Sequence, residues 1–137
     1  MPRALPIAAA IALFAALPAH AATIYDCSMN VSRDDAWVQP KIALVLDNSG
    51  QSVKVSDPII RGVTGKDWID GNLEKSVAGQ MRVTWAVKTE SSTNQRTTMD
   101  YTAQIDLAAQ TIGVYARPRG FDNSFFFKGT CAVSKVK

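Results

Sequence analysis

The chain has 137 residues, of which 47% are hydrophobic and 20% charged, and its formal net charge is +3. This length suits one domain with a hydrophobic core, and so small a positive charge gives no support for a nucleic-acid partner. The only histidine, His20, lies in the leader described below, so the rest of the chain has no imidazole. This excludes serine–histidine and cysteine–histidine catalysis and the usual ligands of zinc, copper and iron sites.

The first 21 residues have the pattern of a secretory signal peptide. Arg3 is followed by an uncharged apolar run, after which the small residues Ala19 and Ala21 form a signal-peptidase site. The run is shorter than the roughly 20 residues that span a bilayer, so we expect cleavage rather than anchoring. We predict a leader at 1–21 and one all-β domain at 22–137, with no transmembrane segment after cleavage. Because the leader is rich in alanine, we expect export to a bacterial periplasm or to the medium.

Apolar and polar residues alternate along most of the mature chain, which indicates antiparallel strands with one buried face. The segments with this pattern, in chain order, are 25–31, 41–46, 53–55, 81–88, 99–107, 112–116 and 124–133. Loops as long as 57–79 are uncommon in compact domains, so we expect an eighth, short strand near Ile59–Val63. The rest of that loop is expected to form an ordered excursion, with one helical turn capped by Asn72.

The two cysteines predict how the strands are arranged. Cys27 and Cys131 lie near the two ends of the mature chain, and in an oxidising compartment they are expected to pair. Both fall on the inward side of their strands, and the bond forms most easily if the first and last strands are antiparallel neighbours. We therefore predict an all-β fold, a single antiparallel barrel of about eight strands closed by this disulfide. A two-sheet β-sandwich is the alternative.

In such a barrel the loops at 32–40, 89–96 and 117–123 lie at the same end. They carry arginine and aromatic residues, which are enriched at the centres of protein interfaces. On the last strand, Phe125 and Phe127 are expected in the core and Phe126 on the outer face. The candidate binding residues are Arg33, Asp34, Trp37, Arg117, Arg119, Phe121 and Phe126. In the alternative interpretation, the arginines keep a turn soluble and pair with Asp34, Asp35 or Asp122.

Carboxylates are the remaining candidates for chemistry. Asp34 and Asp35 are adjacent, so only a loop could direct both at one substrate, whereas a glycosidase pair lies about 5–10 Å apart across a cleft. Four oxygen ligands suited to calcium occur close together, at Asp67, Asp70, Asn72 and Glu74. Their spacing matches the EF-hand loop only in fragments. We therefore predict that the protein is not an enzyme and has no catalytic residues, metal site or cofactor.

A Tyr-x-Cys motif near the mature N-terminus, Tyr25-Asp26-Cys27, combines with Cys131 and the expected small exported barrel. This combination is similar to the lysozyme-inhibitor families of Gram-negative periplasms. The resemblance covers only these residues and the architecture. Those families use a serine–glycine–tyrosine loop, and the nearest stretch here, 48–51, lacks the aromatic residue, so we do not assign the chain to them.

The function predicted from the sequence is an exported, non-catalytic binding module. Its rim loops would contact an envelope or secreted protein. The alternatives are a protein like the lysozyme inhibitors and a periplasmic carrier of a small apolar ligand inside the barrel, since eight strands just allow such a cavity. Large inward residues such as Trp85 and Tyr101 favour a filled interior. Nucleic acid is not expected as a partner, and the sequence leaves the ligand and the oligomeric state open.

Overall fold

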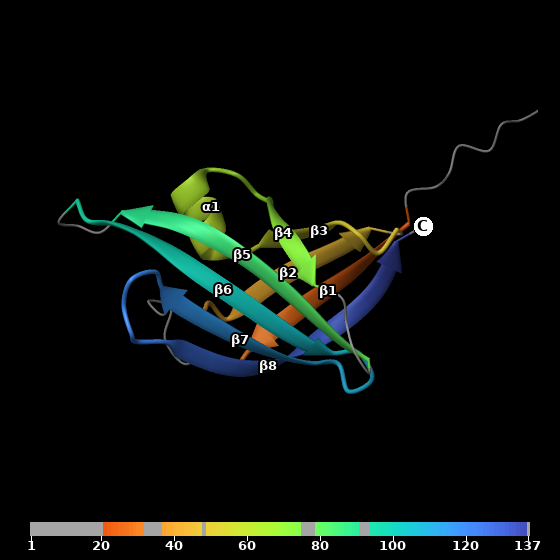
Figure 1. The fold of residues 1–137 in the computed structure, drawn as a ribbon. Helices are drawn as coiled ribbons and strands as arrows, with labels where there is room; N and C mark the ends of the chain where they lie inside the picture. Colours follow the sequence, from red (N-terminus) through yellow and green to blue (C-terminus); the bar gives the residue numbers. More distant parts are fainter. Residues whose placement is uncertain (1–20, 32–36, 48, 75–78, 91–93, 137) are drawn as a thin grey trace, which may run out of the picture.

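The protein folds as a closed barrel of eight antiparallel strands, in which each strand pairs with the next along the chain and the last pairs with the first (Figure 1). The computed structural model describes residues 21–31, 37–47, 49–74, 79–90 and 94–136. The strands are β1 (Ala22–Met29), β2 (Lys41–Asp47), β3 (Val53–Ser56), β4 (Ile69–Glu74), β5 (Gln80–Glu90), β6 (Arg96–Asp106), β7 (Thr111–Pro118) and β8 (Phe125–Val136). The predicted barrel is confirmed. All of the predicted leader except Ala21 lies outside the described residues.

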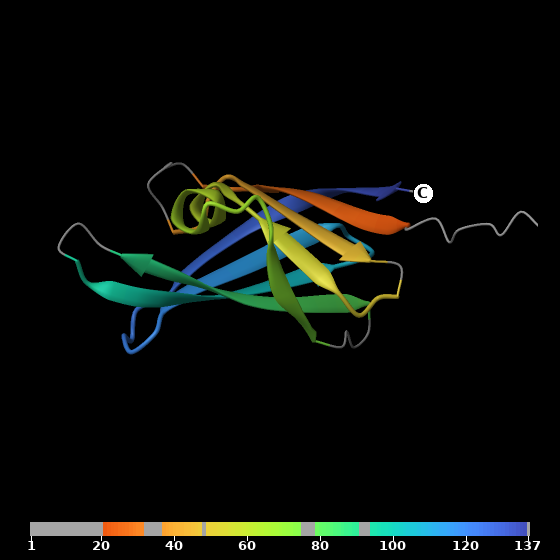
Figure 2. The same cartoon turned by 90° about the horizontal axis from the view of Figure 1, so that it is seen from above.

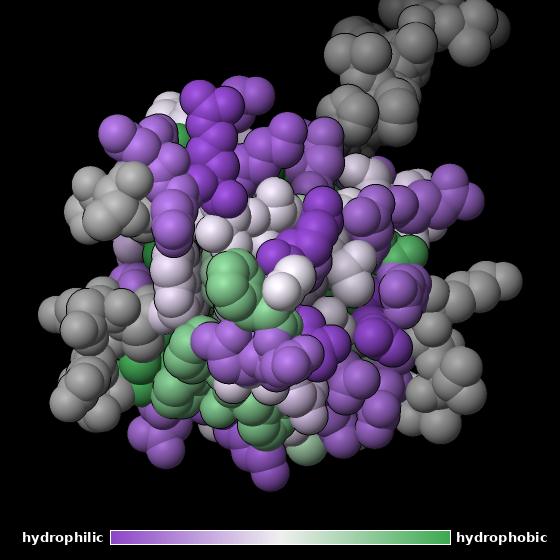
Figure 3. Space-filling model, turned by 60° about the vertical axis from the view of Figure 1, so that its left-hand side comes forward, coloured by the Kyte–Doolittle hydropathy of each residue, from purple (hydrophilic) through white to green (hydrophobic). Residues whose placement is uncertain are grey.

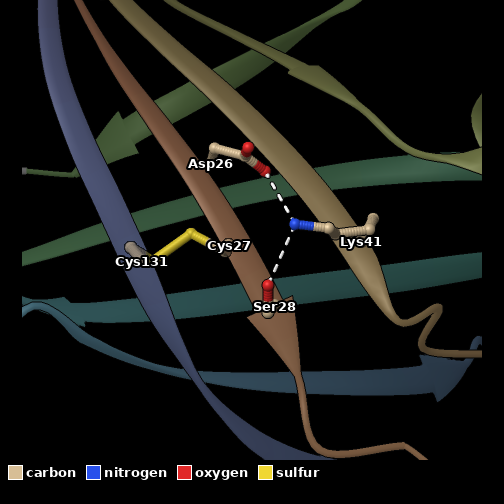
Figure 4. Close-up of polar contacts among 5 residues, drawn as sticks. All are labelled: Asp26, Cys27, Ser28, Lys41 and Cys131. Atoms are coloured by element: carbon tan, nitrogen blue, oxygen red, sulfur yellow. Dashed lines mark hydrogen bonds and ion pairs between the residues drawn. A yellow bond between two sulfur atoms is a disulfide. The ribbon is translucent and has the colours of Figure 1, made fainter.

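The barrel is closed covalently between β1 and β8. Cys27 and Cys131 are direct partners in the antiparallel register, and their sulfur atoms are 2.07 Å apart, which confirms the predicted disulfide (Figure 4). On the other side of β1, the ammonium group of Lys41 in β2 lies 3.0 Å from Ser28 Oγ and 3.5 Å from Asp26 Oδ1. Cross-strand contacts therefore hold β1 on both sides.

The connections β1–β2, β3–β4, β5–β6 and β7–β8 meet at one end of the barrel, called the loop end below, and the ends of β1 and β8 near the chain termini lie at the opposite end (Figures 1 and 2). The β3–β4 connection contains the helix α1 (Pro58–Thr64), which lies at the loop end. Ile60 of this helix is fully buried in the core. One side of the barrel end is thus covered by α1.

The predicted strand near Ile59–Val63 is wrong, because this segment is α1. Its end signals decide the outcome: the side chain of Asp57 accepts a 2.7 Å hydrogen bond from the backbone N–H of Ile60, and Pro58 begins the helix. Gly65 ends it in the left-handed region at φ 70°. These caps outweigh the strand preference of the β-branched residues between them.

The predicted helical turn capped by Asn72 is also wrong, because Asn72 lies within β4. Ile69 and Leu73 face inward and Asp70 faces water, so the segment alternates like the other strands. Gly71 occupies an inward position where a Cβ would lie 3.1 Å from methyl groups of Val53, Val55 and Val83. Its small size lets β4 approach the core, and the count of eight strands is kept with β4 in place of the predicted fourth strand.

Side chains fill the interior of the barrel. Trp85 and Tyr101 face each other across β5 and β6 with ring centroids 5.3 Å apart and nearly parallel planes. Both are buried, as are Met81 and Met99, whereas Phe125 and Phe127 are partly buried against the same core. Among the described residues, Trp85 Nε1 is a buried donor without an acceptor. The interior therefore has the packed character that eight strands allow.

Removal of the disulfide should lower the free energy of unfolding. The bond joins residues 104 positions apart, so its loss restores conformational freedom to nearly the whole unfolded domain. We expect Cys27→Ala combined with Cys131→Ala to cost about 2–5 kcal/mol, measured by urea unfolding. The wild-type protein under reducing conditions serves as the control and should match the double variant. An unchanged unfolding midpoint would contradict this account of closure.

Gly129 should tolerate no side chain, because the backbone of β1 lies directly against it. A Cβ at this position would overlap the carbonyl oxygen of Ser28 and lie 2.9 Å from the Cα of Met29. We expect Gly129→Ala to destabilise the barrel by about 1–3 kcal/mol. Gly62→Ala is the matched control, since open space surrounds that helical position, and it should stabilise the protein by about 0.5–1 kcal/mol. Equal thermal shifts for the two variants would contradict the prediction.

Candidate functional site

A pocket of about 270 Å³ opens at the loop end, between the β1–β2, β5–β6 and β7–β8 connections. Trp37 and Phe121, which are 37% and 57% exposed, stand on its rim. It is called the mouth pocket below and is lined by Trp37, Thr89, Gln95, Thr97, Met99, Pro118, Phe121, Asn123 and Phe125. The walls are mainly apolar. Figure 3 brings the loop end forward and shows hydrophobic surface (green) gathered on this side between hydrophilic side chains (purple).

Trp37 is anchored through its backbone, which leaves its side chain exposed. The buried hydroxyl group of Tyr101 donates a 2.9 Å hydrogen bond to the carbonyl oxygen of Trp37, and the next residue, Val38, is fully buried. The backbone N–H of Met29 donates to the carbonyl oxygen of Pro40 at 2.8 Å. The end of the β1–β2 loop is therefore fixed to the barrel core.

A tight turn after β7 positions Phe121. The backbone N–H of Arg119 donates to the carbonyl oxygen of Thr98 at 2.8 Å, and that of Phe121 donates back to Pro118 at 3.2 Å. Gly120 between them has φ 86°, a backbone conformation that favours glycine. The ring is thus presented to solvent on a short turn that hydrogen bonds hold at both ends.

The guanidinium group of Arg119 is paired with Asp100 in a bidentate arrangement. Nε and Nη2 lie 3.1 Å and 2.7 Å from the two carboxylate oxygens, and this contact raises the pKa of Arg119 above its ordinary value. The sequence suggested Asp34, Asp35 or Asp122 as partners, and the observed partner lies instead on the neighbouring strand β6. Both side chains are substantially exposed, so this pair orients the arginine and contributes little to stability.

The structure divides the predicted binding residues into two groups. Trp37, Phe121 and Arg119 lie at the loop end, and Arg119 lines a shallow depression next to Phe121. Arg117 and Phe126 point instead to the outer wall of the barrel, where Phe126 packs against Tyr115 with ring centroids 4.3 Å apart. Arg33 and Asp34, like Asp35, lie outside the described residues.

Sequence reasoning missed several residues at these surfaces. Met99 is buried in the core, and it also lines the mouth pocket together with Pro118. Tyr115 was passed over because it lies between the inward residues of its strand. The alternation pattern could have identified it, because Tyr115 faces outward on its strand and Phe126 faces outward on the next strand along the chain.

Asp57 is a buried carboxylate beneath the loop end, and it caps α1. Burial raises the pKa of Asp57, and the hydrogen bonds from backbone N–H groups, with the nearby charge of Arg61, oppose this shift only in part. Burial also raises the pKa of Tyr101 far above its ordinary value, and the charge of Asp57 adds to the effect. Both groups have structural roles: Asp57 caps α1, and Tyr101 holds the backbone at Trp37.

The oxygen ligands considered for calcium are directed to other partners. Asp70 lies 2.9 Å from the ammonium group of Lys54, and Glu74 lies 3.3 Å from the guanidinium group of Arg82. Within the part of the chain that the structure describes, no group of three or more histidine, cysteine or acidic side chains could hold a metal ion.

Comparison of the chain with protein-family models, with curated proteins and with solved structures found no match. In the described ranges, the structure contains no helix of the length and apolar character needed to cross a membrane. A function is therefore inferred from the geometry of the mouth pocket and of the outer wall that carries Arg117 and Phe126.

Substitution of Asp57 should separate its charge from its capping role. Because burial raises its pKa above the unfolded value, the folded protein holds a proton at pH values where the unfolded chain has released it. The contribution of this group to the free energy of unfolding therefore falls as the pH rises through the window above about 3.9. Asp57→Asn keeps a capping oxygen without the charge, so its stability relative to wild type should increase across that window.

The measurement is urea unfolding of both proteins from about pH 4 to about pH 7. Asp57→Ala is the control, because it removes the cap as well and should cost about 1 kcal/mol. Parallel pH profiles for the wild type and Asp57→Asn would show that the charge of Asp57 carries no such penalty.

Proposed function

We propose that the protein is an exported, non-catalytic binding module that receives an apolar side chain of a protein partner in its mouth pocket. The main support is the distribution of exposed hydrophobic side chains. Of the eight large ones exposed among the described residues, four lie at the loop end: Trp37, Val63, Trp68 and Phe121. Two of these, Trp37 and Phe121, line the mouth pocket, and exposed apolar residues grouped around a pocket are typical of an interaction surface.

The dimensions of the pocket favour a protein side chain over a carried small molecule. Its volume of about 270 Å³ lies just below the range of about 300–1,000 Å³ that is usual for small-molecule sites. Met99 closes the pocket toward the core, and the stacked rings of Trp85 and Tyr101 occupy the interior. These features count against the alternative of a carrier with its ligand inside the barrel.

Polar groups at the edge of the pocket suit a contact between proteins. Gln95 and Asn123 line it, and the Arg119–Asp100 pair lies close by. In protein interfaces an apolar centre supplies most of the affinity, and the polar rim fixes orientation. Trp37 and Phe121 would be the residues with the largest effect on affinity.

Rigid support for the pocket would favour tight binding. The backbone at Trp37 is bonded to the core through Tyr101, and the turn at Phe121 is bonded to β6 through Arg119. A surface that is already ordered before contact loses little conformational entropy on binding. This is consistent with a module whose role is recognition rather than chemistry.

Export is supported by two features of the chain. The predicted leader ends at Ala21, and β1 begins at the next residue. The disulfide is of the kind that persists in oxidising compartments, and it closes the whole domain. These features support our proposal that the mature protein acts in the periplasm or outside the cell.

The proposal is tested by expressing the full chain with its leader and a C-terminal affinity tag, and recovering bound envelope proteins for mass spectrometry. Trp37→Ala and Phe121→Ala should each weaken binding of the recovered partner by about tenfold or more, measured with purified proteins. Leu107→Ala is the matched control, because it truncates an exposed apolar residue at the opposite end. A partner bound equally by all three variants and wild type would exclude the mouth pocket.

A further inference from the structure

The outer wall of the barrel carries a flat aromatic surface that the mouth pocket does not explain. Tyr115 and Phe126 are register partners on β7 and β8, are 45% and 42% exposed, and their ring planes meet at 32°. The ring of Phe126 lies over Gly113, where a Cβ would approach its Cε2 to 2.9 Å. Gly113 therefore lets this ring lie on the sheet instead of projecting into water, and the two rings form one platform.

Depressions flank the platform and meet at Tyr115 and Gln104. One, of about 430 Å³, extends toward Asp106 and Lys128, and the other, of about 340 Å³, extends toward Asp100 and Arg117. The strip that joins them is called the outer strip below and comprises Thr102, Gln104, Tyr115, Arg117, Phe126 and Lys128. It combines aromatic rings with amide, hydroxyl and cationic groups along three adjacent strands.

Two cations of the outer strip have no carboxylate partner among the described residues, since the acidic groups nearby are engaged elsewhere. Asp100 is paired with Arg119 and Glu74 with Arg82. Asp106 accepts hydrogen bonds from the backbone of its own turn. Arg117 and Lys128 are left available for an external anion.

These two cations lie at opposite ends of the platform. Arg117 follows Tyr115 by two residues on β7, and Lys128 follows Phe126 by two residues on β8. Because the strands are antiparallel, these steps of about 7 Å lead in opposite directions. The arrangement is therefore a cation, two rings and a second cation along a diagonal of the sheet.

We propose that the outer strip binds an acidic polysaccharide. The C–H face of a pyranose ring carries partial positive charge and packs on the negative face of an aromatic ring. Thr102 and Gln104 can then exchange hydrogen bonds with sugar hydroxyl groups, and Arg117 and Lys128 can bind carboxylates on two separate sugars of the same chain, where charge-assisted hydrogen bonds are strong. The unpaired cations make the strip complementary to an anionic glycan rather than a neutral one.

Two other polymers match the strip less well. Peptides commonly bind sheets by adding a strand at a free edge, and the outer strip lies on β6, β7 and β8, each of which is paired with a strand on both sides. A nucleic acid needs a row of cations for its regularly spaced phosphates, whereas the outer strip carries two, Arg117 and Lys128, one at each end of the platform. A glycan can also use its ring faces on the aromatic rings and its hydroxyl groups on Thr102 and Gln104, so it depends less on a row of cations.

The test uses polygalacturonate as the probe and its fully methyl-esterified form, which has the same sugar rings without the charge, as the matched ligand. Binding is measured by calorimetry with the mature chain. We expect the wild type to bind polygalacturonate and the neutral form to bind at least about tenfold more weakly. Tyr115→Ala should weaken binding by about tenfold. Arg117→Gln and Lys128→Gln should each weaken it by about two- to fivefold, with unchanged thermal stability.

Lys135→Gln is the control for charge, because it removes a cation from the same strand at its far end, and it should bind like the wild type. Trp37→Ala should also bind normally, so that failure of the mouth pocket and failure of the outer strip are distinguished. The proposal is overturned if the wild type does not bind polygalacturonate. It is also overturned if Lys135→Gln weakens binding as much as Lys128→Gln, or if a single-stranded oligonucleotide binds as tightly as the glycan, since either result means general charge attraction.

Discussion

The pairing of the first strand with the last is the contact on which the rest of the structure depends. Cys27 and Cys131 face each other in that pairing and join two segments 104 positions apart. Closure gives every strand a hydrogen-bonded neighbour on both sides along at least part of its length, which reduces a common route to aggregation. It also determines which loops are neighbours, because alternating connections of an up-and-down barrel must meet at the same end.

From this constraint follow two surfaces of different character. At the loop end, the β1–β2 and β7–β8 connections bring Trp37 and Phe121 together around an apolar pocket. On the outer wall, side chains that alternate away from the core place Tyr115 and Phe126 near Arg117 and Lys128, which have no carboxylate partner among the described residues. The barrel thus separates an apolar pocket at the loop end from an aromatic and polar strip on the outer wall, and both are supported by the same filled core.

The sequence predicted the architecture because alternation and two cysteines are strong local signals. The positions of Cys27 and Cys131 on inward faces were enough to make the terminal strands neighbours. The segment 57–79 was assigned wrongly because Asp57 and Pro58, which begin a helix, precede β-branched residues that favour a strand. In β4, Gly71 and its polar neighbours have the composition of a turn. Only the packing of Gly71 against Val53 and Val83 shows why the segment is a strand.

The sequence predicted only part of the candidate site, because the partners of a single side chain depend on the register between neighbouring strands. Topology alone places Trp37 and Phe121 at one end, but the pairing of Arg119 with Asp100 depends on how β7 is aligned with β6. The same holds for Tyr115, whose importance comes from lying directly opposite Phe126. The alternation within one strand does not show which residue of the neighbouring strand lies directly opposite a given side chain.

The three tryptophans of the chain differ in their surroundings, which gives the protein its own optical probes. Trp85 is enclosed beside Tyr101, whereas Trp37 and Trp68 are open to solvent at the loop end. A molecule that covers the mouth pocket would alter the emission of Trp37, which lines it, and leave that of the enclosed Trp85 unchanged. Loss of the fold would change all of them, so fluorescence can distinguish docking from denaturation without any label.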